Sequence, residues 1–135
     1  MKKTSGFSLL ELLIVLTIIT ILGALSVPLY SQHFIHANRL EAELYLIKLA
    51  GKLEQYHIVN NTFQGADLNT LGFSETIVAN QYRLAIVTNT ESTFSLQAQP
   101  LDTQAEKDVL CGTLGLNSLG EKDFTGTGTL KECWQ

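Results

Sequence analysis

Charged side chains are missing from one long part of this 135-residue chain. No aspartate, glutamate, lysine or arginine occurs from Leu12 to Asn38. Phe7 to Val27 is a run of 21 residues in which Glu11 is the one charged side chain. About 20 apolar residues span the hydrocarbon core of a bilayer as an α-helix. The gap in charge therefore predicts one membrane-spanning helix.

Basic residues are also scarce: nine lysines and arginines stand against 13 acidic residues, for a net charge of −4. This balance argues against general nucleic-acid binding, which needs cations to displace the counterions of phosphates. The chain has three histidines, of which His33 and His36 share a helix face, but solvated or interface histidines are the favoured interpretation. We find neither a nucleophile-elbow motif nor calcium-loop spacing, so we expect no enzyme, metal site or cofactor.

The flanking charges predict the orientation of the helix. Lys2 and Lys3 precede the apolar run, and no further basic residue occurs until Arg39. By the positive-inside tendency, the amino terminus stays in the cytoplasm and the rest is exported. An alternative is an ordinary secretory signal, for which Gly23-Ala24-Leu25-Ser26 offers a weak cleavage site after the apolar core.

Glu11 is out of place in the apolar run. A carboxylate in hydrocarbon costs about 2.5–3.5 kcal/mol on insertion scales, so such a residue usually has a partner and a function. The combination of a short basic leader, Gly6, Phe7, Glu11 and a long apolar helix resembles the signal sequence of type IV prepilins. The resemblance implies cleavage by a prepilin peptidase between Gly6 and Phe7, methylation of Phe7, and a role for Glu11 in assembly.

Cleavage would also give Glu11 a partner. The new α-amino group of Phe7 would be mostly cationic at neutral pH, and opposite charges attract strongly at low dielectric. The amine could belong to the same chain or to a neighbouring subunit, where it would set the axial register of a filament. The alternative is a glutamate at the headgroup level of a plain signal anchor.

The helical pattern continues beyond the membrane segment. Apolar residues recur at helical spacing at Ala42, Leu46, Leu49, Leu53 and Tyr56, with Leu40, Leu44 and Ile47 widening this face. The charged residues, including Arg39 and Glu43, take other positions. Gly23 and Pro28 predict a kink or a locally melted segment, and many pilins also carry a proline at the position of Pro28.

The second half of the chain shows strand patterns. Alternation predicts strands at 82–87 and 94–99, a third strand with Leu110, Leu114 and Leu116, and a fourth at about 121–125. We expect a polar loop from Gln104 to Asp108. We interpret the glycine-rich segment from Thr125 to Thr129 as flexible backbone, because it lacks the lysine of a phosphate-binding loop.

The two cysteines, Cys111 and Cys133, are predicted to form a disulfide, since an exported chain enters an oxidising compartment. A redox or metal pair is the other interpretation, although no C-x-x-C is present. In type IV pilins a terminal disulfide bounds the D-region, and the tail of this chain looks similar to the end of PilE-like minor pilins.

These observations together predict an α+β fold, in which a long N-terminal helix packs on a four-stranded antiparallel sheet with a disulfide-bounded C-terminal region. The predicted segments are a leader (1–6), a membrane and filament-core helix (7–28), an amphipathic helix (29–59), an αβ-loop (60–80), and the sheet with the D-region (81–135).

The resemblance implies a structural subunit of a type IV pilus, anchored in the inner membrane before assembly and extracellular afterwards. Its partners would be other pilin subunits, the prepilin peptidase and the assembly machinery. Type IV pili generally serve adhesion, twitching motility and DNA uptake. Two alternatives stay open: a pseudopilin of a type II secretion system, and a membrane-anchored binding module that never polymerises.

Overall fold

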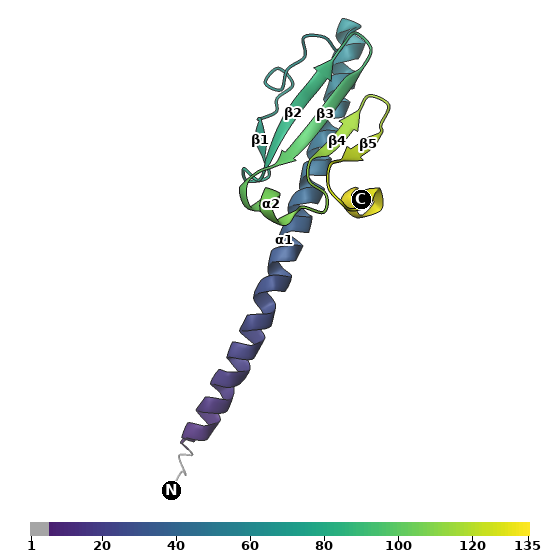
Figure 1. Ribbon diagram of the computed structural model, residues 1–135. Helices are drawn as coiled ribbons and strands as arrows, with labels where there is room; N and C mark the ends of the chain where they lie inside the picture. The colour runs from purple at the N-terminus through teal and green to yellow at the C-terminus, as the bar shows by residue number, and fades with distance from the viewer. Residues whose placement is uncertain (1–5) are drawn as a thin grey trace. The chain divides into compact units, whose positions relative to one another are not determined.

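The computed structural model describes residues 6–135, which divide into two compact units, one ending at Phe34 and one beginning at Ile35. Helix α1 (Leu9–Asn60) contributes to both (Figure 1). The leader residues Met1–Ser5, with the predicted topology signals Lys2 and Lys3, lie outside the described residues. We call the second unit the head.

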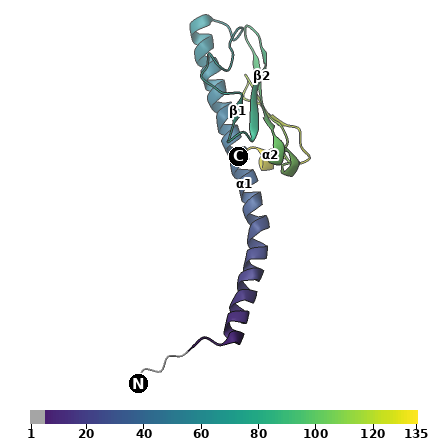
Figure 2. The ribbon, with the colours of Figure 1, turned by 90° about the vertical axis from the view of Figure 1, so that its left-hand side faces the viewer.

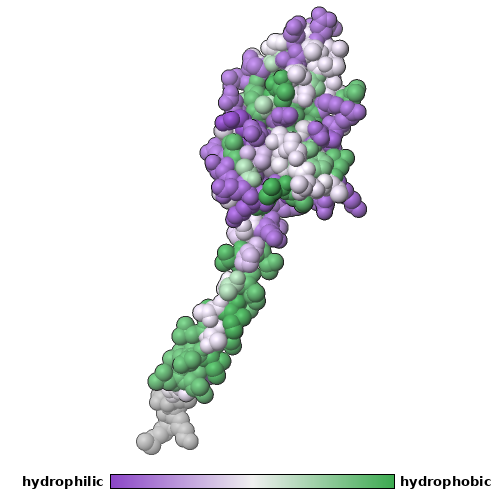
Figure 3. Space-filling model, in the orientation of Figure 1, coloured by the Kyte–Doolittle hydropathy of each residue, from purple (hydrophilic) through white to green (hydrophobic). Residues whose placement is uncertain are grey.

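In the first unit, every side chain from Phe7 to Tyr30 is exposed, and Figure 3 shows this stretch as almost continuous apolar surface. By length and composition, α1 could cross a membrane. The hydroxyl groups of Thr17, Thr20 and Ser26 bond to their own helix. Thr17 Oγ1 donates to the Leu13 carbonyl at 2.7 Å, and Ser26 Oγ donates to the Leu22 carbonyl at 2.7 Å. Satisfying polar groups within the helix suits a hydrocarbon environment.

The head contains a five-stranded antiparallel sheet in the order β1-β2-β3-β4-β5, one strand more than predicted. Its strands are β1 (Thr76–Ile77), β2 (Tyr82–Asn89), β3 (Phe94–Pro100), β4 (Leu114–Asn117) and β5 (Lys122–Phe124). Two short helices complete the head, α2 (Asp102–Lys107) and α3 (Leu130–Cys133). Figures 1 and 2 show the sheet lying along the upper part of α1.

The predicted apolar face of α1 forms the helical side of the core. Ala42, Leu46, Leu49 and Leu53 are fully buried. They share one core cluster with the inward residues of the central strands, which are Tyr82, Leu84, Leu96, Ala98, Leu114 and Leu116. Period-2 alternation in the strands and helical spacing in α1 thus bury their apolar sides against each other.

Several local predictions were wrong. Leu44 and Ile47 are 54% and 48% exposed instead of widening the buried face. Arg39 and Glu43 are buried, although their charges placed them on the polar side. The expected polar loop Gln104–Asp108 is mostly helix α2, with Gln104 fully buried. The strand that was predicted as the third is β4. It begins at Leu114 and does not include Leu110, which lies in a turn.

The αβ-loop is held against the sheet by aromatic and polar contacts. Phe63 is 3% exposed, stacks on His57 with ring centroids 4.4 Å apart, and meets Phe94 edge-on at 5.0 Å. The amide of Asn89 on β2 donates to the carbonyls of Phe63 and Ala66 at 3.1 and 2.9 Å. This loop is therefore a packed part of the head.

Candidate functional site

The residues predicted for processing lie ahead of the first helical turn. Gly6, Phe7 and Ser8 are exposed and precede α1, and Phe7 is 74% exposed. The Ser8 side chain accepts a hydrogen bond from the Leu10 amide at 3.3 Å, and the Ser8 carbonyl accepts one from the Glu11 amide at 3.0 Å. These bonds satisfy amides that have no partner within the helix.

Glu11 lies in the first turn of α1 and is exposed. Among residues 6–135, we find no hydrogen-bond or ion-pair partner for its carboxylate. A negative charge near a helix N-terminus is favoured by the helix dipole, but this does not replace a counterion in lipid. The pairing of Glu11 with the Phe7 amine stays a prediction.

Gly23 and Pro28 both lie inside α1, which is helical at every residue from Leu9 to Asn60. The predicted melted segment is therefore absent from this helix. A Cβ atom at Gly23 would meet nothing within 4 Å, so packing within the chain does not require glycine there. A kink at Pro28 stays a prediction.

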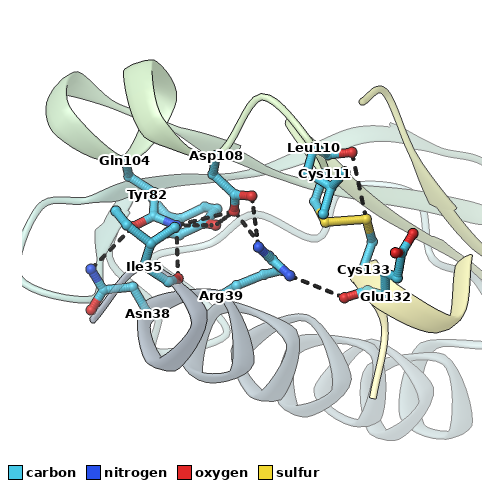
Figure 4. A network of polar contacts seen from close by, with 10 residues as sticks. All are labelled: Ile35, Asn38, Arg39, Tyr82, Gln104, Asp108, Leu110, Cys111, Glu132 and Cys133. Carbon is cyan, nitrogen blue, oxygen red and sulfur yellow. Dashed lines mark hydrogen bonds and ion pairs between the residues drawn. A yellow bond between two sulfur atoms is a disulfide. The ribbon is translucent and has the colours of Figure 1, made fainter. Parts of the chain in front are cut away.

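A buried polar network, which sequence reasoning missed, joins four elements of the head (Figure 4). Arg39 of α1 donates to both carboxylate oxygens of Asp108, from Nη2 at 2.7 Å and from Nε at 2.9 Å. Its Nη1 donates to the carbonyl of Glu132 in α3 at 3.0 Å. Because both partners of the ion pair are buried, each charge depends on the other for its stability.

Gln104 and Tyr82 complete the network. Gln104 Nε2 lies within hydrogen-bond distance of the Ile35 carbonyl, the Tyr82 hydroxyl and Asp108 Oδ2, at 3.0, 3.0 and 3.1 Å. The Tyr82 hydroxyl donates to Asp108 Oδ2 at 3.3 Å. Burial, and then the charge of Asp108, raises the pKa of the Tyr82 phenol. The hydroxyl therefore stays protonated and can donate at any physiological pH.

The disulfide between Cys111 and Cys133 is formed, with both cysteines fully buried. It joins helix α3 to the turn before β4, because the strand begins at Leu114, after Cys111. Gly126 and Gly128 lie against this turn, and their amides donate to the carbonyls of Cys111 and Leu110 at 3.0 and 2.8 Å. A Cβ atom at Gly126 would collide with the Leu110 carbonyl oxygen. Glycine is needed here for close packing, so the flexible interpretation was wrong.

Glu43 is a second buried charge on α1. It is 3% exposed, and its Oε2 accepts the Gln135 amide at 3.1 Å. Its other oxygen, Oε1, is buried without a hydrogen-bond partner. Burial raises the pKa of this carboxyl, and the Gln135 amide, then the charges of Lys122 and Arg39, act against the increase.

A shallow hollow of about 470 Å³ lies between the αβ-loop and β2. Its charged lining consists of Arg83, Asp67 and Glu75, and its amides are those of Asn69 and Asn89. These groups can form hydrogen bonds but contain no nucleophile with a neighbouring base. Among residues 6–135, no cluster of three or more histidine, cysteine or acidic side chains could hold a metal ion.

Two family models cover most of the chain. The model described as type IV minor pilin ComP, DNA uptake sequence receptor, matches residues 28–115, and the prokaryotic N-terminal methylation motif matches residues 1–27. The fimbrial protein EcpB of Eikenella corrodens is 48% identical over 52 residues, which are 37% of this chain and 33% of EcpB. The chain therefore spans about a third of the length of this curated relative.

Two solved structures have the same fold. The non-core minor pilin PilV of Neisseria meningitidis matches with a TM-score of 0.52 and 24% identity, over 73% of this chain and 94% of PilV. A type IV pilin from Shewanella oneidensis matches with the same TM-score and identity, over 75% of this chain and 98% of that pilin. By its family match and its fold, the chain belongs to the type IV minor pilin family of ComP.

Proposed function

We propose that this protein is a minor subunit of a type IV pilus that takes part in DNA uptake by binding DNA at the pilus surface. The observation that carries the proposal is the match of residues 28–115 to a family described as a DNA uptake sequence receptor. This stretch includes most of the core sheet, the buried network without Glu132, and the hollow beside Arg83.

Processing at the amino terminus prepares the subunit for assembly. Prepilin peptidase cuts after Gly6, and the new terminal residue Phe7 is methylated. Support comes from the match of residues 1–27 to the methylation motif and from the exposure of the segment ahead of α1. A peptidase needs an accessible, non-helical backbone, and Gly6 to Ser8 provide one.

Glu11 sets the register of the subunit in the filament by pairing with a Phe7 ammonium of a neighbouring subunit. The hydroxyl groups of Thr17, Thr20 and Ser26 bond within the helix, whereas the Glu11 carboxylate needs an external partner. In lipid, a lone buried charge is costly and a paired charge is tolerated. Assembly would therefore stabilise Glu11 as well as bury the apolar surface.

DNA binding must use a small set of cations. Removing Lys2 and Lys3 with the leader lowers the formal charge from −4 to −6, and the charge of Arg39 is neutralised by Asp108. The exposed cations of the head are Lys48, Lys52, Arg83, Lys107, Lys122 and Lys131. Six cations can make only a few of the phosphate contacts that bind DNA of any sequence. A receptor with so few cations must rely more on base contacts, which recognise one sequence.

The number of cations limits how strongly DNA binding can depend on salt concentration. Each phosphate contact contributes about −0.9 to the slope of log K against log salt for duplex DNA. Six cations therefore limit the slope to about −5. Titration of the processed protein, which begins at Phe7, in detergent against duplex DNA at several salt concentrations measures the slope. A clearly steeper value would contradict binding by these side chains.

The cellular test scores DNA uptake, pilus formation and protein secretion in the same strains. Deletion of the gene should abolish uptake of labelled DNA, and the wild-type gene should restore it. Glu11→Ala should insert into the membrane, fail to enter pili and fail to restore uptake. Unchanged uptake in the deletion strain would reject the receptor function, and loss of protein secretion with intact pili would favour the pseudopilin alternative.

A further inference from the structure

The outer edge of β2 is only partly covered by β1 (Figure 1). Strand β1 pairs with the first two residues of β2, and Glu75, directly before β1, accepts the amide of Leu84 at 2.7 Å. Upstream of Glu75 the chain turns away from β2, because the amide of Phe73 donates to the Leu68 carbonyl at 2.8 Å. Among residues 6–135, the edge of β2 after Leu84 therefore has no neighbouring strand.

Ile86 directs both of its backbone polar groups to this free edge. Alternate residues of an antiparallel strand direct their N–H and C=O groups to the same side. The Leu84 amide donates to Glu75, on the side of β1, so Ile86, two residues later, faces the same side. Within the described part of the chain, we find no hydrogen bond from the αβ-loop to either group of Ile86. This residue therefore offers one donor and one acceptor to an incoming chain.

Ile86 lines the hollow between the αβ-loop and β2. The volume of the hollow, about 470 Å³, falls within the range of about 300–1,000 Å³ that is usual for ligand sites. Ala66 and Leu84 are buried and Leu68 is half-buried, so they form an apolar floor. Charged and amide side chains are exposed around this floor. A binding surface commonly has such an apolar centre within a polar rim.

The rim of the hollow carries two acids and one base. Asp67, Glu75 and Arg83 are exposed, and none of them forms an ion pair within residues 6–135. The amide of Thr70, and then its hydroxyl group, hold the pKa of Asp67 below its usual range. Asp67 is therefore anionic at neutral pH. With two carboxylates against one guanidinium, the rim repels phosphate and attracts a cation.

We propose that the hollow binds an extended, basic segment of a partner protein, which adds to β2 as a short strand opposite Ile86. A peptide backbone satisfies both free groups of Ile86, and strand addition to a sheet edge is a common mode of peptide binding. Basic side chains of the segment lie near Asp67 and Glu75. This activity goes beyond DNA binding and does not depend on it.

The segment belongs to another protein because this chain has no suitable segment free within residues 6–135. Its strands pair with one another in the sheet. The last two residues are held, since the Trp134 side chain donates to the Asp123 carbonyl and the Gln135 amide donates to Glu43. The non-helical residues ahead of α1 contain no basic side chain.

Peptide titration followed by NMR tests the proposal on the full-length protein in detergent. The probe is acetyl-Thr-Lys-Val-Lys-Thr-amide, and the readout is the shift of the Ile86 amide signal. Three further peptides carry an N-methyl group on one of the three central residues, which removes one backbone donor and keeps the side chains. A fourth peptide has glutamate in place of both lysines.

We expect the probe to shift the Ile86 amide signal with a Kd below about 1 mM. Successive N–H groups of a strand point to opposite sides. N-methylation should therefore weaken binding about tenfold at the residue opposite Ile86, and less than about threefold at the residue next to it. The glutamate peptide should bind at least about threefold more weakly than the probe.

Variants of the rim test the charge contribution. Asp67→Asn/Glu75→Gln should weaken binding of the probe by about threefold, and the asparagine can still accept the Thr70 amide as Asp67 does. Glu54→Gln/Glu91→Gln is the matched control, because it removes two exposed acids that lie outside the hollow. This control should leave binding of the probe unchanged.

Four results would overturn the proposal. The first is a probe that does not bind at about 1 mM or that shifts other signals and not that of Ile86. The second is an equal loss of affinity at all three N-methylated positions. The third is a shift of the Ile86 signal by a DNA duplex and not by the probe, which would make the hollow a DNA contact. The fourth is slow exchange of the Ile86 amide in a dimeric protein without peptide, which would show that a second copy covers the edge.

Discussion

Replacing Asp108 by asparagine should destabilise the head strongly, although the change keeps the size of the side chain. The carboxylate accepts hydrogen bonds from Arg39, Tyr82 and Gln104. In Asp108→Asn, the amide group would meet an Arg39 N–H donor directly, and the buried guanidinium would lose its counterion. Removing one partner of a buried ion pair costs about 3–5 kcal/mol, which is a large part of the stability of a small domain.

A second variant separates the loss of charge pairing from a general loss of packing. In Arg39→Met/Asp108→Asn both charges of the ion pair are removed together, and asparagine can still bond to Tyr82 and Gln104. The double variant should therefore be more stable than Asp108→Asn alone, despite carrying one more substitution. Glu106→Gln, an exposed change on α2 two residues before Asp108, should shift stability by less than about 0.5 kcal/mol.

Urea unfolding of the full-length protein in detergent measures these differences. The single tryptophan, Trp134, is 5% exposed and donates to the Asp123 carbonyl at 2.9 Å, so its fluorescence reports the packing of α3 on the head. A cost below about 1 kcal/mol for Asp108→Asn, or a double variant less stable than the single one, would refute the view that this ion pair holds the head together.

Further predictions concern Glu43, two glycines and the disulfide. Because burial raises the pKa of Glu43 in the folded state, this residue contributes most to stability below its unfolded pKa, and the contribution is lost as pH rises through the folded pKa. Glu43→Gln should therefore raise the urea midpoint at pH 7 and not at pH 3.5. A lower midpoint at pH 7 would contradict this prediction. Gly126→Ala forces a Cβ atom onto a backbone carbonyl and should lower stability by about 1–3 kcal/mol or more. Gly51→Ala, in open space on α1, should raise stability by about 0.5–1 kcal/mol. Equal shifts of the thermal unfolding midpoint in the two variants would contradict close packing at Gly126. Cys111→Ala/Cys133→Ala opens a loop of 22-residue separation and should cost roughly 3 kcal/mol on the chain-entropy model, and unchanged urea unfolding would reject that role.

The regular parts of the head could be predicted because their patterns are strong. The buried α1 residues Ala42 to Leu53 follow helical spacing, and β3 alternates along its whole length. Strand β2 alternates over its first residues and has a bulge between Ile86 and Thr88. Strand β1 has only two residues, too few to show alternation. It leads into a turn where Val78, Ala79 and Asn80 all have positive φ. Valine rarely adopts this conformation, so the residue types gave no turn signal.

The buried polar network could not be predicted, since each member has an ordinary role when considered alone. Arg39 and Glu43 stand among exposed charges of an amphipathic helix, and charged residues are rarely buried without a partner. The partner of Arg39, Asp108, is 69 residues away in the chain. One signal was available in the sequence. Arg39 and Glu43 lie four residues apart and share a helix face with the buried Leu46, which indicates that both could face the core. The prediction placed Arg39 and Glu43 on the exposed side because they are charged, although their helical positions lie on the buried side. In the fold both are buried, because Asp108 pairs with Arg39 and the Gln135 amide bonds to Glu43.

The processing of the precursor is the step on which the filament proposal depends, because it creates the ammonium that would neutralise Glu11. Mass spectrometry of the amino-terminal peptide, from protein isolated with sheared pili, tests it most directly. We predict that the mature chain begins with N-methylated Phe7. A chain that still begins at Met1, or one that begins after Ser26, would contradict the proposal, because Glu11 could then never pair with a terminal amine at Phe7.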